Sequence, residues 1–255
     1  MSQAYEWEKI NDELTKLLRL TNTPLAMKWC GTEEEIRRIP KARTSEKRFS
    51  PCQVMGQAIY FNWTVAVLAR NIHADYCRGI HGMFEPDDKF RSGKMFENVW
   101  YDNTEASRQH HAALNLVPAK YVGIVYSPLS SGRIAEPDVC AIYANSAQIF
   151  MLLCGLTHTK YEKLDFTFVG ESTCSDSWVR TFVTGKPSVS IPCFAERKFG
   201  GVRDSDILVT LRPADLVTAI GGVRGLSKNG LRYPIPPYSL SADIMDGLPP
   251  SYAEY

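Results

Sequence analysis

The chain has 255 residues, of which 44% are hydrophobic and 22% are charged, and its formal net charge is +1. These values are ordinary for a globular protein, and near-neutrality gives no electrostatic basis for binding nucleic acid or an anionic membrane. No segment approaches the roughly 18 apolar residues of a membrane span, and the polar, acidic N-terminus does not resemble a signal peptide. We therefore expect a cytoplasmic protein without membrane or nucleic-acid partners. Disulfides rarely persist in the cytoplasm.

Apolar spacing in the first hundred residues predicts two helices and one strand. Helical spacing covers residues 3–20, and the short apolar run 25–29 predicts a buried strand. Residues 31–48 are rich in charge and predict a surface segment. A second helix is expected to open at Cys52 and to run through Trp63, whereas the glycines of residues 71–93 predict irregular structure.

The remainder of the core sequence alternates strands with helices. Strands are predicted at 121–126, 139–143, 164–169, 188–191 and 207–211, and helices at 104–116, from 146 to 154, 173–183 and 213–220. A strand followed directly by a helix, as at 139–154, indicates an α/β unit with a parallel strand pair. The expected fold class is therefore α/β, with mixed α+β as the alternative. Residues 1–225 would form a single large domain in which helices flank a mixed sheet.

Residues 226–255 form a separate segment rich in proline. Five of the fifteen prolines lie between 233 and 250, which excludes a regular helix or a central strand. Apolar residues such as Tyr238 and Leu240 nevertheless need burial. The segment is expected to be an extended C-terminal arm that packs either on its own subunit or on a neighbour in a homo-oligomer.

Local context divides the seven cysteines into two groups. Four lie beside turn formers or at predicted helix starts, where a thiolate can be directed at a shared point: Cys52, Cys77, Cys174 and Cys193. Three lie within or at the end of apolar runs and are expected to be buried and inert: Cys30, Cys140 and Cys154. The first four lack the paired C-x-x-C spacing of zinc ribbons, so only a folded domain could bring them together. A metal site and a set of scattered buried thiols both remain open at this point.

Three further residues near these cysteines are candidates for substrate contacts. His81 lies four residues after Cys77, and its ordinary pKa near 6.5 would suit a proton donor. Arg78 and Arg197 could each hold a carboxylate or phenolate by paired hydrogen bonds. His110, with its neighbour His111, is instead expected on a solvated helix face.

Several segments together resemble successive landmarks of one family. They are residues 24–28 (PLAMK), Cys52-Gln53 at a helix start, Cys77 with Gly79, 126–129 (YSPL), 137–139 followed by 145–148 (NSAQ), and 185–187 (GKP) leading to Cys193. In this order, over residues 10–222, they resemble the domain-of-unknown-function family 169, also called the ArCR family, found widely in archaea and anaerobic bacteria. The family pattern has cysteines matching the first group of four and none matching the other three. It typically has Cys-Pro-Gly-Gly where this chain has Cys77-Arg78-Gly79-Ile80.

The resemblance favours a metal site, and the dispersed thiols and anaerobic relatives favour a [4Fe–4S] cluster over zinc. The expected function is that of an iron–sulfur enzyme of anaerobic metabolism acting on a small oxygenated organic substrate, by reductase or by lyase/dehydratase chemistry. One alternative is a non-catalytic iron–sulfur or zinc carrier or assembly module, and another is a metal-free small-molecule binding protein. A concave pocket with polar groups beside the cysteines would favour an enzyme.

Overall fold

A computed structural model describes residues 5–248 and residue 252, and its core is one six-stranded sheet of order β2-β3-β1-β4-β6-β5. The strands are β1 (Leu25–Cys30), β2 (Val65–Leu68), β3 (Gly123–Pro128), β4 (Val139–Ala144), β5 (Ser188–Ser190) and β6 (Ile207–Leu211). The mixed α/β class is confirmed. The expected parallel pair is wrong, because all five pairings between these described strands are antiparallel. Strand β4 does lead into a helix, but both of its neighbours in the sheet run opposite to it.

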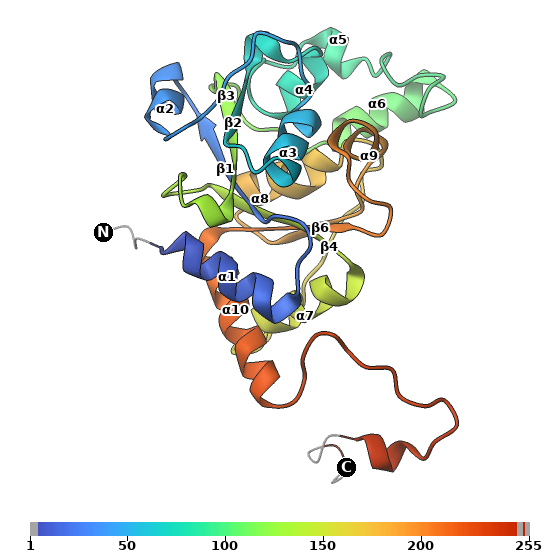
Figure 1. Ribbon diagram of the computed structural model, residues 1–255. Helices are drawn as coiled ribbons and strands as arrows, with labels where there is room; N and C mark the ends of the chain where they lie inside the picture. Colours follow the sequence, from blue (N-terminus) through green and yellow to red (C-terminus); the bar gives the residue numbers. More distant parts are fainter. Residues whose placement is uncertain (1–4, 249–251, 253–255) are drawn as a thin grey trace.

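Helices cover both faces of the sheet (Figure 1). One face carries α1 (Trp7–Leu18), α7 (Ser146–Leu156) and α10 (Pro213–Lys228). The other carries α3 (Pro51–Tyr60), α4 (Asp75–Ile80), the π-helical turn η3 (Ser175–Val179) with α8 (Arg180–Thr184), and α9 (Phe194–Gly200). Shorter peripheral elements are α2 (Glu33–Arg38), α5 (Asp88–Arg91), α6 (Thr104–Ala113) and the 3₁₀ turns η1 (Ala69–Asn71), η2 (Leu129–Ser131) and η4 (Ile244–Gly247).

The sheet separates two hydrophobic cores, and the side chains of each strand alternate between them. On β3, Val125 faces the core under α1, α7 and α10, whereas Ile124 and Tyr126 face the core under α3 and α4. Successive side chains of a strand point to opposite faces, so this alternation assigns each strand residue to one core. Every cysteine expected to act together lies on the face of Tyr126.

Four local predictions differ from the structure. Residues 164–169 form no strand and are largely exposed, so their alternating pattern has no core to face. The expected irregular segment 71–93 contains α4 and α5, and α3 ends at Tyr60 so that the following residues can enter the unpredicted strand β2. Helix α10 continues through its glycines to Lys228, because Gly222 allows close approach to α7: a Cβ there would overlap the main chain of Gly155.

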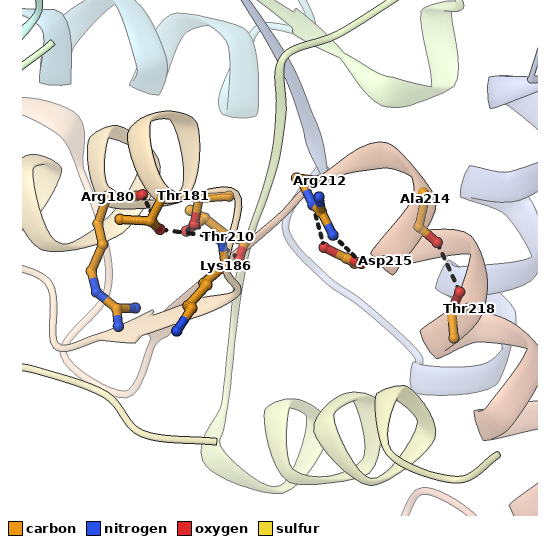
Figure 2. A network of polar contacts seen from close by, with 9 residues as sticks. Arg180, Thr181, Lys186, Thr210, Arg212, Ala214, Asp215 and Thr218 are labelled. Atoms are coloured by element: carbon orange, nitrogen blue, oxygen red, sulfur yellow. Dashed lines mark hydrogen bonds and ion pairs between the residues drawn. The ribbon is translucent and has the colours of Figure 1, made fainter. Parts of the chain in front are cut away.

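Figure 2 shows two polar contacts near strand β6, one between α8 and the strand and one within the start of α10. Thr181 of α8 shares a 2.7 Å hydrogen bond between hydroxyl oxygens with Thr210 of β6. At the start of α10, Arg212 Nε donates to Asp215 Oδ2 over 2.9 Å. The first contact matters for the site described below, because α8 continues the helical segment that begins beside Cys174.

The C-terminal arm leaves the domain after α10 and runs away from it (Figure 1). Its last contact with the core is Tyr233, whose hydroxyl accepts a 3.1 Å hydrogen bond from Asn145 Nδ2. Beyond that point apolar side chains are exposed, including Ile235 at 51% and Leu240 completely. Pro249, Pro250 and Tyr255 lie outside the described residues, as do residues 1–4. No helix in the described part of the chain is long and apolar enough to cross a membrane.

Truncation of the arm after Leu231 should lower the oligomeric state, because exposed apolar side chains favour burial against a neighbour. The measurement is the mass in solution by light scattering, compared with the full chain at equal concentration. The double variant Ile235→Ser, Leu240→Ser should have the same effect if these side chains carry the contact. An unchanged mass in both would instead support an arm that folds onto its own subunit.

Candidate functional site

Four separate elements carry the four cysteines of the first group. Cys52 occupies the first turn of α3, whose start is fixed by a capping box between Ser50 and Gln53. Cys77 lies within α4, Cys174 directly precedes η3, and Cys193 is the N-cap residue of α9. Cys52, Cys174 and Cys193 are at most 9% exposed, and Cys77 is partly buried. All seven cysteines are free thiols.

Hydrogen bonds join the segments that carry these cysteines. The Tyr76 and Ser172 hydroxyls lie 2.7 Å apart, which connects the Cys77 segment to the Cys174 segment. Thr173 Oγ1 donates to the carbonyl of Ile191 over 2.7 Å, which connects the Cys174 segment to the Cys193 segment. These contacts are buried or nearly so, so they hold three of the four thiols in a common region independently of any bound group.

The four thiols also interact electrostatically with one another. Burial raises the pKa of Cys52 well above its usual value, and the charges of Glu196, Cys193, Cys174 and Cys77 raise it further. Burial, followed by the charges of Cys193 and Cys77, also raises the pKa of Cys174 well above its usual value. Burial and the charge of Cys193 raise the pKa of Cys77 to about 12. These contributions link every pair among the four thiols, which lie in one region of the protein.

The remaining cysteines take no part in this cluster. Burial raises the pKa of Cys140 to about 12, with no other cysteine contributing. Burial also raises the pKa of Cys30 to about 12, with smaller contributions from Glu35, Lys28 and Asp138. The burial expected for Cys30 and Cys140 is confirmed, but Cys154 is only partly buried because it lies near the edge of the α7–α10 contact.

Two tyrosines of the sheet lie on the same face as the thiols. Tyr143 of β4 donates its hydroxyl to Glu196 Oε1 over 2.7 Å. Tyr126 of β3 is fully buried, and its hydroxyl has no hydrogen-bond partner. Burial, followed by the charges of Cys52, Cys174, Cys77 and Glu196, raises its pKa. A buried, unpaired hydroxyl is costly and requires explanation.

The donor set and this hydroxyl fit an anionic metal–sulfur group. Four thiols supply the ligands that iron–sulfur clusters prefer, and the hydroxyl of Tyr126 would find an acceptor in a thiolate or sulfide sulfur. Among the described residues, no group of three or more His, Cys, Asp or Glu side chains stands ready to bind a single metal ion.

Glu196 is a completely buried carboxyl group beside the thiols. Its Oε2 accepts a 3.0 Å hydrogen bond from the main-chain N–H of Cys193, while Oε1 accepts from Tyr143. Burial raises the pKa of Glu196 to about 7. The residue was missed in the sequence, although a cysteine three residues before a glutamate at a helix start is the spacing of a capping box.

A pocket of about 670 Å³ opens beside Cys193. Its walls are mainly apolar, with four aromatic rings, and its charged side chains are Glu171 and Arg197; the aromatic lining residues are Trp100, Tyr101, Phe168 and Phe194. Glu171 accepts hydrogen bonds from the main-chain N–H groups of Phe194 and Ala195 at 3.2 and 3.3 Å. A small organic molecule could therefore lie against aromatic walls with one thiol at its edge.

Of the two arginines expected to contact substrate, only one lines the pocket. Arg197 lines the pocket, but its guanidinium group donates to the carbonyls of Pro192 and Arg203 and pairs with Asp204 at 3.2 Å. Arg78 does not line that pocket and forms an ion pair with Asp75. Thus Arg197 lies at the pocket, where a small molecule could bind, and Arg78 does not line it.

His81 lies in the core rather than in an open loop. Its ring is 1% exposed, Nδ1 lies 2.7 Å from the carbonyl of Cys77, and Nε2 accepts a 3.0 Å hydrogen bond from the indole of Trp178. Burial lowers its pKa to about 4. Because both nitrogens are occupied, the geometry gives no support to the expected proton-donor role and favours a structural one. His110 is also buried, at 6% exposure, and the expectation of a solvated face is wrong.

Two glycines set the distance between α3 and α9. A Cβ at Gly56 would lie 2.5 Å from the main-chain oxygen of Gly200. Gly56→Ala should therefore destabilise the protein by about 1–3 kcal/mol through overpacking and should weaken metal binding by displacing Cys52 from Cys193. Gly221→Ala is the matched control, since a Cβ there meets nothing within 4 Å. Chemical denaturation and metal titration check both variants, and equal behaviour of the two would contradict the expectation.

Comparisons with known proteins identify the family of the chain. The model of family DUF169, described as uncharacterised ArCR, matches residues 13–221. Uncharacterized protein MJ0308 of Methanocaldococcus jannaschii is 23% identical over 217 residues, covering 82% of this chain and 91% of that protein. No solved structure matches. Because the family model spans most of the chain, the protein belongs to the DUF169 family of uncharacterised ArCR proteins.

Proposed function

We propose that the protein is an iron–sulfur enzyme that binds a [4Fe–4S] cluster through Cys52, Cys77, Cys174 and Cys193. The observation that carries the proposal is that the four segments bearing these thiols are packed together: hydrogen bonds join those of Cys77, Cys174 and Cys193, and α3 with Cys52 closely approaches α9 with Cys193. When bound, such a cluster supplies electrons or Lewis acidity. A cytoplasmic location and a role in anaerobic metabolism belong to the same proposal.

The placement of the four thiols on four separate elements supports a cluster over zinc. A single zinc ion draws all its ligands to about 2.3 Å from one centre, and no described group of side chains stands ready for that. In a cubane cluster each thiolate binds a different iron, so its thiols stand farther apart. The unpaired hydroxyl of Tyr126 provides a second argument, because a cluster offers sulfur acceptors beyond its ligands.

The pocket beside Cys193 supports an enzyme over a carrier. A carrier must expose its ligands to a receiving protein, whereas Cys52, Cys174 and Cys193 are at most 9% exposed. The pocket combines aromatic walls with Glu171 and Arg197, which suits a small oxygenated organic molecule with an apolar ring or chain. The chain's own contribution would be to hold this molecule and exclude water, with Arg197 closest to an anionic group. Reductase and lyase chemistry both agree with this arrangement.

The test is the metal content of full-length protein purified without oxygen. We expect about four irons and four sulfides per chain, with broad visible absorption that bleaches on reduction or exposure to air. Zinc at one per chain, without sulfide, would overturn the cluster and favour a structural metal. A metal-free protein after reconstitution with iron and sulfide would overturn the whole proposal.

A further inference from the structure

We propose that Tyr126 is a positioning residue whose hydroxyl donates a hydrogen bond to a sulfur atom of the bound cluster, either a sulfide or a cysteine ligand. This inference rests on the proposed function and adds a residue that the cysteine pattern does not contain. Tyr126 lies opposite Met27 of β1 and Val65 of β2, so its backbone is fixed from both sides of the strand.

The ring of Tyr126 is enclosed in the core. The ring packs edge-on to Trp178 with centroids 6.5 Å apart, and the residue is completely buried. Solvent therefore cannot satisfy the O–H group, and no described protein atom does so. The charges of Cys52, Cys174, Cys77 and Glu196 all raise its pKa. Both oxygens of Glu196 already accept hydrogen bonds, from Tyr143 and from the main chain of Cys193, so sulfur atoms are the acceptors that we assign to the Tyr126 hydroxyl.

A hydrogen bond to a cluster sulfur would affect the electron affinity of the cluster. Reduction adds negative charge, part of which resides on the sulfurs, and a donor stabilises the reduced form more than the oxidised form. The wild-type hydroxyl should thus raise the reduction potential. Removal of the hydroxyl should lower it without removing a ligand.

Tyr143 offers a matched control on the same face of the sheet. Its hydroxyl is buried like that of Tyr126 but already has a protein acceptor, Glu196, at 2.7 Å. Tyr143→Phe should destabilise even the metal-free protein, because it leaves a buried carboxyl group without its donor. Tyr126→Phe should leave the metal-free protein at least as stable as wild type, because it removes an unpaired polar group.

The experiment compares wild type, Tyr126→Phe and Tyr143→Phe, each purified without oxygen as the full chain. For Tyr126→Phe we expect unchanged iron and sulfide content, a more negative reduction potential, and loss of the deuterium-sensitive part of the iron–sulfur stretching bands in resonance Raman spectra. An unchanged potential and unchanged bands in a fully loaded variant would overturn the role of Tyr126 and leave the proposed function intact. Absence of a cluster from wild type would overturn the proposed function and this inference with it.

Discussion

Serine in place of Cys174 should reduce cluster affinity by at least about tenfold, since even residues that only support metal ligands contribute ten- to hundredfold. Serine retains the size of the side chain but binds iron far less well than a thiolate. The same loss is expected at Cys52, Cys77 and Cys193, which share the electrostatic contact. Iron and sulfide analysis of protein purified without oxygen measures the effect.

Cys140→Ser is the matched control. Cys140 is 1% exposed, even less than Cys174, but it belongs to the core on the opposite face of the sheet. Its replacement should leave iron content unchanged while costing some stability, because a hydroxyl replaces a small apolar group in the core. Loss of iron from a folded Cys140→Ser variant would show that the cysteines were divided wrongly. If one of the four serine variants at Cys52, Cys77, Cys174 and Cys193 still binds a cluster, the cluster is held by the other three cysteines.

Between pH 7 and pH 4, acid should destabilise wild type by about 3 kcal/mol more than it destabilises His81→Asn. Burial lowers the pKa of His81 from 6.5 to about 4 in the folded protein. Between these values the unfolded chain binds a proton that the native state does not, so the stability contributed by neutral His81 is present above pH 6.5. It is lost as the pH falls to 4 and below.

At pH 7 the variant itself should be less stable than wild type by about 1–3 kcal/mol, because the indole N–H of Trp178 loses its acceptor. Denaturation of metal-free protein across the pH range measures both effects, and subtraction of the wild-type curve cancels other titrating groups such as Glu196. His73→Asn is the control, since His73 is exposed. A difference that does not change with pH would mean that His81 is not held neutral in the core.

Much of the local structure can be predicted because its signals are local. Strand β6 and the first residue of α10 follow from an apolar β-branched run and a proline at a helix start. The partition of the cysteines follows from the same kind of signal: Cys193 stands at a helix start, whereas Cys140 lies inside a strand. Turn and cap chemistry acts over a few residues, so the sequence carries it directly.

The chemistry of the site depends on contacts between residues far apart in the sequence. His81 follows Cys77 by four residues, yet its role is decided by Trp178, ninety-seven residues away. Tyr126 has the pattern of any core strand residue, and only the arrangement of α3, α4 and η3 over the sheet leaves its hydroxyl unpaired beside thiols. The antiparallel pairing of β4 could not be predicted from its own sequence either, because the relative direction of a strand depends on the neighbouring strands, here β1 and β6. The sequence by itself thus separated the four candidate metal ligands from the other cysteines, and the tertiary structure decided which buried groups surround them, since burial and hydrogen-bond partners are properties of the packed chain.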